Sequence, residues 1–208
     1  MPISLADQYL NDVYTCLGLS KANSKEKYNR LADINSELDR INSSLPKQMN
    51  VKTTGTINER LVQLALEGFM PESWYSLNDN KYQWLGDFGV QGYPLSVVIS
   101  VKSFKTKERL LVSGTGSLHA PTIGWGRFDD KTEFSEKRLE AYLFRGFLAI
   151  YMPKETLDGL SLGAKQTLNF YRRPFLRAID KFGIDMLGSC YSPETKTGVS
   201  KLLDISSF

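Results

Sequence analysis

Apolar residues recur at helical spacing through the first 45 residues, with polar and charged residues between them. The first stripe runs from Leu5 to Leu17 and ends at Gly18, which is typical of one amphipathic helix. A second, narrower seam precedes Pro46 and consists of Tyr28, Leu31, Ile34, Leu38, Ile41 and Leu45. Such a seam packs either against its own domain or against a second copy in a dimer.

The segment from Leu95 to Lys102 predicts a strand, because alternate residues divide into two different faces. One face is wholly apolar, whereas the other carries Ser100 and ends on Lys102. The segment from Lys81 to Phe88 predicts the preceding strand, and a turn around Gly92-Tyr93-Pro94 would place Asp87 opposite Ser100. A carboxylate and an ammonium would then converge on one side of the sheet. These groups can hold a divalent cation and activate a water against a phosphodiester.

The remaining periodicities predict further elements on both sides of this pair of strands. They are a helix over Thr56 to Gly68, a third strand over Glu108 to Ser113, a long loop over Gly114 to Thr132, a helix over Glu133 to Tyr142, a buried strand over Phe144 to Met152, and a mainly helical segment over Ala164 to Phe182 interrupted by Arg172-Arg173-Pro174. Together they indicate an α/β or α+β domain, with a central mixed sheet flanked by helices.

Composition narrows the class of protein but does not identify it. A chain of 208 residues is long enough to bury one core, and its net charge of +3 by itself implies little about nucleic acid. Cys16 and Cys190 form no disulfide framework, so we expect a reducing cytoplasm. The N-terminus has no basic region followed by an apolar run, and no apolar run reaches about 18 residues. We therefore expect no signal peptide and no membrane span.

Several kinds of catalytic site are excluded by what the chain lacks. His119 is the single histidine, so a zinc site built from Cys and His is hardly feasible. The chain has no P-loop, no G-x-G-x-x-G and no G-x-S-x-G elbow. The triplet Asp87-Phe88-Gly89 occurs without the companion motifs of a kinase, so we interpret it as coincidence.

The paired positions Asp87 and Lys102 resemble the motif of the PD-(D/E)XK nucleases, and most of all the small type II restriction endonucleases. In that family an acid on one strand and an acid-x-lysine on the next bind magnesium and position the nucleophile. Ser100 departs from the pattern, because the family usually has Glu or Asp there. Some members keep a serine and supply the missing acid from a helix, and Glu59 is our candidate for that acid. The resemblance covers about residues 56 to 113.

The resemblance implies a single nuclease-like domain over 1–208, with 1–50 as a helical packing or dimerisation segment and 51–208 as the catalytic core. It implies Mg²⁺ as the cofactor, with Asp87 and Glu59 as ligands, Lys102 orienting the attacking water, and the Val101 carbonyl as an added ligand. It also implies a homodimer that cuts double-stranded DNA at a short palindrome, because two-fold protein symmetry matches two-fold DNA symmetry.

Plainer interpretations of the same residues stay open. Thr56-Ile57-Asn58-Glu59 also fits a capping box, in which the glutamate satisfies a backbone N–H at the helix start. Asp87 after a glycine fits an ordinary turn, and Lys102 fits a strand-end lysine that reaches water. Two other functions remain: a DNA-binding module without catalysis, and a structural or protein-interaction domain that uses the N-terminal helices.

Basic, aromatic and loop residues supply the candidate DNA contacts. Met49 could act as an apolar wedge in the minor groove, although such a residue more often covers a gap in a core. Lysines and arginines contact phosphates, whereas donors and aromatics of the long loop suit base edges. The candidates are Met49, Lys52, Lys105, Lys107, His119, Trp125, Arg127, Arg172 and Arg173.

Overall fold

Six strands form one mixed sheet at the centre of the molecule. A computed structural model describes residues 3–45, 51–78, 86–92, 96–102, 110, 114, 120–129 and 131–189. Along the sheet the strands follow their order in the chain: β1 (Tyr75–Leu77), β2 (Phe88–Val90), β3 (Val97–Lys102), β4 (Thr122–Gly126), β5 (Phe147–Met152) and β6 (Leu176–Ala178). β1, β2 and β3 pair antiparallel, whereas β3, β4, β5 and β6 pair parallel. The predicted central mixed sheet is confirmed.

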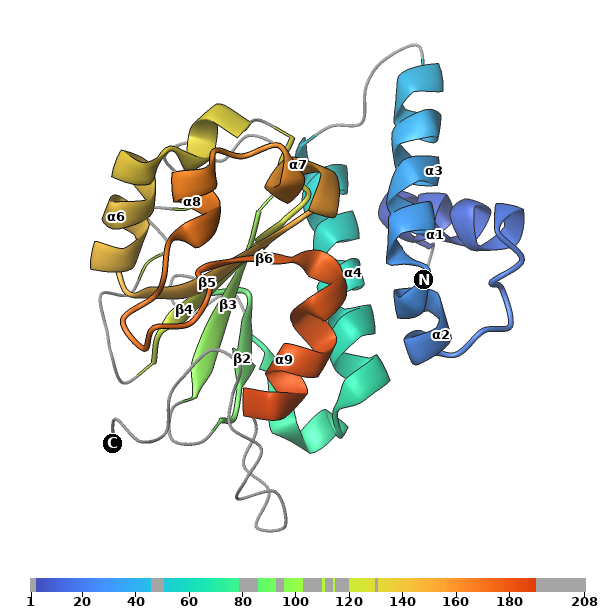
Figure 1. The fold of residues 1–208 in the computed structure, drawn as a ribbon. Coiled ribbons are helices and arrows are strands. Elements are labelled where there is room, and N and C mark those ends of the chain that lie inside the picture. The colour runs from blue at the N-terminus through green and yellow to red at the C-terminus, as the bar shows by residue number, and fades with distance from the viewer. Residues whose placement is uncertain are drawn as a thin grey trace.

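Helices cover both faces of this sheet (Figure 1). One face is packed by α4 (Val51–Phe69) and α9 (Phe182–Ser189), and the other by α6 (Glu136–Phe144) and α8 (Leu162–Gln166). The short α7 (Lys154–Asp158) follows β5. The helices α1 (Leu5–Cys16), α2 (Ser24–Asn29) and α3 (Leu31–Ser44) form an outer layer beyond α4 (Figure 1). None of the described helices is long and apolar enough to span a bilayer.

The alternation predicted for β3 decides how the sheet packs. Val97, Ile99 and Val101 are buried in the same apolar cluster as α4 and the N-terminal helices. β5 is buried along its whole length and sends side chains into the clusters on both faces of the sheet. A strand that is buried on both faces reads as a continuous apolar run. For this reason the sequence revealed β5 as clearly as it revealed β3.

The seam predicted in the first 45 residues packs against its own chain. Tyr28, Leu31, Ile34 and Leu38 are each at most 3% exposed and belong to the cluster that contains α4. The predicted single helix is divided at Arg30 into α2 and α3, and Asn23 begins α2 with a complete capping box. Most of the seam is therefore occupied within one chain.

Several predicted segments differ from the structure. The strand expected from Phe144 begins at Phe147, because Phe144 still belongs to α6. Residues 122–126, placed in a long loop, form the buried strand β4. Residues 167–178, placed in a mainly helical segment, contain a turn and β6. Helix α4 begins at Val51 instead of Thr56. Most of the strands predicted over Lys81 to Phe88 and Glu108 to Ser113 lies outside the described residues, and Leu110, which is described, is helical.

Candidate metal and phosphate site

Asp87 lies at the start of β2 and is held there by β3. Phe88 pairs with Ile99, so Asp87 falls opposite Ser100, as the predicted hairpin implied. The Asp87 N–H donates to the Ile99 carbonyl at 2.7 Å, and the Val101 N–H donates to Asp87 Oδ2 at 2.6 Å. A Cβ on Gly86 would lie 2.3 Å from Val98 Cγ1, so only glycine lets the chain approach β3 this closely. The carboxylate is therefore fixed, and Asp87 is not an isolated turn residue.

Lys102 ends β3 and turns its ammonium toward the same carboxylate. Lys102 Nζ lies 3.8 Å from Asp87 Oδ2, and the two side chains are 21% and 19% exposed. The cation is thus partly withdrawn from water and beside an acid, rather than extended freely into solvent. Since β3 is parallel to β4, β5 and β6, the pair lies at the edge of the sheet where all four of these strands end. Ligands of α/β proteins commonly bind at this edge.

Helix α4 supplies the third charged group of the site. Burial raises the pKa of Glu59 above its ordinary value, and the nearby Asp87 carboxylate raises it further, while Arg60 and Lys102 oppose both effects. Two carboxylates and one ammonium therefore share one electrostatic environment. Because α4 begins at Val51, Glu59 lies beyond its second turn and cannot serve as the N3 residue of a capping box. The capping interpretation of Glu59 is wrong.

Two buried polar groups at this site were not singled out as site residues from the sequence. Asn58 is fully buried, and its Nδ2 donates to the Lys102 carbonyl at 2.8 Å. Among the residues that the structure describes, neither Asn58 Oδ1 nor the Oγ of the fully buried Ser100 has a hydrogen-bond partner. Buried polar atoms are usually paired. These two atoms add polar groups to the buried side of the site, although they are not the sole atoms of this kind in the described part of the chain.

The donors at this edge suit a hard divalent cation that also binds substrate. Val101 points its N–H at Asp87, and a strand residue directs its carbonyl to the same side as its N–H, so the Val101 carbonyl faces the Asp87 side as well. The described residues contain no cluster of three or more His, Cys, Asp or Glu side chains that could hold a metal by themselves. Mg²⁺ is usually bound by one or two carboxylates together with waters and substrate phosphates. Asp87 and Glu59 fit that requirement.

Trp125 and Arg127 do not lie in an exposed loop, and this corrects their assignment as base contacts. Trp125 is fully buried in β4. Arg127 is 4% exposed, and its Nη2 donates to the Asn35 carbonyl at 3.1 Å and to the Asp39 carboxylate. Burial lowers the pKa of Arg127, and Asp39 opposes this shift. Arg127 therefore joins α3 to the end of β4.

A cavity of about 670 Å³ lies beside this contact, between the N-terminal helices and the ends of β4, β5 and β6. Arg127 and Asp39 are among its lining residues, together with Lys154, Asp180 and Lys181. The lining does not include Glu59, Asp87 or Lys102. The cavity and the candidate site thus occupy different parts of the same sheet edge.

The other predicted DNA contacts are divided between the two edges of the sheet. Lys52 is exposed on α4, seven residues before Glu59, so both side chains lie on about the same side of the helix. Arg172 and Arg173 precede β6 and lie at the edge where the parallel strands begin, away from Lys102. The structure does not bring them to the candidate site. Met49, Lys105, Lys107 and His119 lie outside the described residues.

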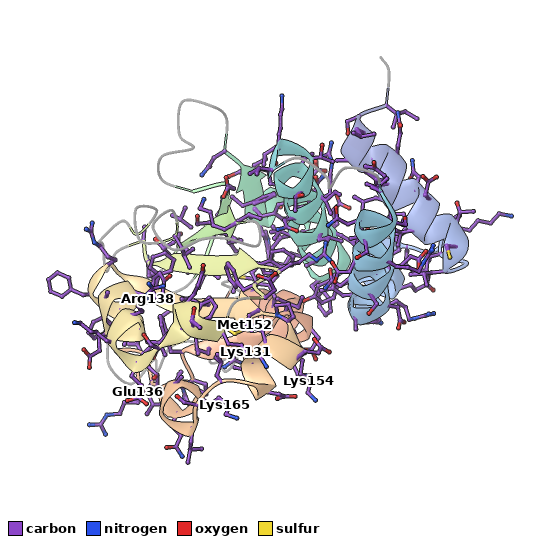
Figure 2. The ribbon with its side chains drawn as sticks, turned by 90° about the horizontal axis from the view of Figure 1, so that it is seen from above. Lys131, Glu136, Arg138, Met152, Lys154 and Lys165 are labelled. Carbon is purple, nitrogen blue, oxygen red and sulfur yellow. The ribbon has the colours of Figure 1, made fainter. Side chains whose placement is uncertain are left out.

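Further basic side chains lie on and around α6, α7 and α8 (Figure 2). They are Lys131, Arg138, Lys154 and Lys165, with Glu136 among them. Lys154 forms an exposed ion pair with Asp158 at 3.5 Å, and Lys165 donates to the Asp158 carbonyl. These local contacts explain the positions of both lysines, so we do not assign them to the site.

Comparison with known proteins supports the fold. No protein-family model and no curated protein matches the chain. Among solved structures, one described as "Restriction endonuclease PspGI-substrate DNA complex" is similar with a TM-score of 0.60 and 13% identity. The match covers 89% of this chain and 92% of the other chain. At this identity the likeness concerns the fold alone, and the chain has a restriction-endonuclease-like fold.

Proposed function

We propose that the protein is a magnesium-dependent DNA endonuclease. The observation that carries the proposal is the convergence of Asp87 and Lys102, whose charged atoms are 3.8 Å apart. Both charges also shift the pKa of the nearby Glu59 carboxylate. Glu59 comes from α4, Asp87 from the start of β2 and Lys102 from the end of β3. Three separate elements thus bring unlike charges to one open edge of the sheet.

Asp87 and Glu59 would hold the cation, and the Val101 carbonyl would add a neutral ligand. When bound, the cation supplies positive charge that stabilises the phosphate as negative charge develops on it. The raised pKa of Glu59 reflects burial and the neighbouring carboxylate, so a positive ligand between the two acids would relieve their repulsion. The site thus favours a cation over its own metal-free state.

Lys102 would act on the phosphate and on the attacking water. Its ammonium donates up to three hydrogen bonds, and its contact with Asp87 directs it toward the proposed cation ligands. A fixed positive donor beside a phosphodiester stabilises charge that is larger in the transition state than in the ground state. Lys102 therefore contributes to the rate of cleavage more than to the affinity for DNA.

Site-specific cleavage of double-stranded DNA by a homodimer is the finer form of this proposal. It rests on the resemblance of Asp87 and Lys102 to the restriction-endonuclease motif, from which Ser100 departs, and on the shared fold. A two-fold dimer would place two copies of the site against the two strands of a palindrome.

Incubation of the purified chain with plasmid DNA tests this function. We expect discrete double-strand fragments with Mg²⁺ and none with EDTA, while Ca²⁺ supports binding more than cutting. Cleavage that persists in excess chelator would contradict the metal assignment. Binding without cleavage would identify a DNA-binding module, and absence of both would favour a protein-interaction domain.

A further inference from the structure

Asn58 is an unusual residue for its position in α4. Its neighbours one turn further along the helix, Leu61 and Val62, are fully buried apolar residues, and Asn58 itself is 0% exposed. Asparagine is a poor helix former, and burying an amide is unfavourable unless its groups are paired. An apolar residue would suit this helix face better. The presence of an amide therefore calls for a local explanation.

The hydrogen bond of Asn58 supplies that explanation. Its Nδ2 donates to the Lys102 carbonyl at 2.8 Å, and so joins α4 to the last residue of β3. Glu59 follows Asn58 directly, about 100° around the helix and about 1.5 Å along it. Beside the apolar packing of α4 on β3, this hydrogen bond therefore helps to set how far Glu59 lies from the residue that ends β3.

Asn58 pairs only one of its two polar atoms. Asn58 Oδ1 is buried without a partner in the described part of the chain, although an apolar side chain of similar shape would leave no such atom. The amide is thus not optimised for stability. Groups that keep a site in working geometry often have this property, because function and stability favour different residues there.

We infer that Asn58 is a positioning residue, whose amide anchors α4 to the end of β3 and thereby holds Glu59 beside Asp87 and Lys102. This inference rests on the proposed magnesium-dependent nuclease function. Residues that support metal ligands typically change metal affinity or activity by about 10- to 100-fold when they are replaced. The variant Asn58→Leu keeps the number and branching of the side-chain heavy atoms, removes the anchor and also removes the unpaired oxygen.

Thr156→Val is a matched control for this change. Thr156 is buried in α7, and its Oγ1 donates to the Phe128 carbonyl just beyond the end of β4. The control thus removes a bond of the same kind, from a helix to a carbonyl at a strand end, without touching the candidate site. It reports the general effect of losing such an anchor.

Three measurements separate positioning from a purely structural role. They are the Mg²⁺ concentration for half-maximal cleavage, the gain in DNA affinity caused by Ca²⁺, and the thermal unfolding midpoint. For Asn58→Leu we expect a rise of about tenfold or more in the Mg²⁺ requirement and a smaller Ca²⁺ effect. Metal-free DNA binding should match the parent, and the midpoint should stay within about 4 °C of it. Thr156→Val should keep the parental response to both metals.

Parental metal dependence in Asn58→Leu would overturn the inference, and so would a lower midpoint with no change in metal dependence. Asn58→Ser, whose side chain stops short of the Lys102 carbonyl, must show the same raised Mg²⁺ requirement. Loss of folding in both variants would assign Asn58 to the core alone. If the parent itself responds to neither metal, the proposed function fails, whereas a responsive parent with unchanged variants refutes only the role of Asn58.

Discussion

Two charged clusters lie on the same sheet and are built in different ways. The first joins Asp87, Lys102 and Glu59 at the edge where β3 ends. The second joins Asp185 of α9 to Arg177 of β6 and Tyr151 of β5. Both contain an acid and a base, so charge alone does not distinguish them. Their burial and their hydrogen bonding do.

The groups of the Asp185 cluster bond directly to one another and are largely shielded from water. Asp185 is 1% exposed, and its Oδ2 accepts from Arg177 Nε at 2.6 Å and from the Tyr151 hydroxyl at 2.9 Å. A buried charge is tolerated in a fold when it is paired and hydrogen-bonded in this way. We therefore assign the cluster a structural role, joining α9 to two strands.

The Asp87 cluster is looser and partly open to water. The Lys102–Asp87 ion pair is 3.8 Å long, and burial and Asp87 together raise the pKa of Glu59. In the absence of a ligand, this arrangement keeps two acids close together at a cost to stability. The carboxylates of the Asp87 cluster are less well compensated than Asp185 is. The comparison therefore marks the Asp87 cluster as the candidate for ligand binding and catalysis.

The first test of this difference removes the positive charge of Lys102 from the Asp87 cluster. Lys102→Gln should lower the rate of Mg²⁺-dependent cleavage by about 10³-fold, since a fixed donor at a developing charge has an effect of this order. A cleavage time course on folded protein measures it. A rate within a few-fold of the parent would remove Lys102 from the chemistry.

A substitution in the Asp185 cluster should lower the stability of the fold rather than the activity. Asp185→Asn leaves the Arg177 charge poorly compensated, and we expect a loss of about 3 kcal/mol in the free energy of unfolding. Chemical denaturation measures this loss, and cleavage per folded molecule should match the parent. A large fall in specific activity without a loss of stability would contradict the structural assignment.

Glu59→Gln should separate activity from stability within one residue. We expect cleavage to fall by about 100-fold, a loss of roughly 2.7 kcal/mol in transition-state stabilisation. Glu67→Gln is the matched control on the same helix, because Ser24 and Gln63 donate to that carboxylate away from the site. Its activity should be parental. Near-normal cleavage by Glu59→Gln would give the metal role to another acid.

The same substitution has a predicted dependence on pH. The pKa of Glu59 is raised in the folded protein, so its ionised form lowers stability at neutral pH. Glu59→Gln should therefore unfold at a higher denaturant concentration than the parent near pH 7 without metal. The difference should shrink as the pH falls through the raised pKa, and vanish below about pH 4, the ordinary range of glutamate. A constant difference across this range would contradict the electrostatic explanation.

The smallest effect on DNA binding is expected for an exposed lysine near the Asp87 cluster. Lys52 is exposed on α4 near the face that carries Glu59, so Lys52→Ala should weaken binding equally for all sequences. The slope of log affinity against log salt should fall by about one unit. Lys137→Ala, an exposed lysine on α6 over the other sheet face, is the control. Equal slopes for the two variants would remove Lys52 from the DNA contacts.

The sequence predicted the open cluster because strand alternation fixes register. The apolar face of β3 had to enter the core, and this placed Ser100 and Lys102 on the other face. The expected hairpin then placed Asp87 opposite Ser100. Asn58 did not stand out in this way. Its importance depends on a hydrogen bond to a residue 44 positions away, which no local pattern records.

The loop assignment of residues 122–126 failed for a physical reason. Gly124 and Gly126 suggested a flexible segment, yet each serves close packing inside the sheet. A Cβ on Gly126 would lie 2.7 Å from the Lys102 carbonyl oxygen, and one on Gly124 would lie 3.2 Å from Ile150. Glycine in a strand can mark such close approach. Because the strand was missed, Trp125 was wrongly expected at a DNA surface.

The most direct test of the open cluster is Asp87→Asn, measured for DNA binding without metal and for cleavage with Mg²⁺. The change keeps the size of the side chain and its ability to accept from the Val101 N–H, but removes a negative charge. Metal-free binding should hold or tighten, because one repulsion with phosphate is lost, while cleavage falls by about 10³-fold or more. Cleavage at the parental rate by folded Asp87→Asn would contradict the assignment of this cluster as a nuclease site.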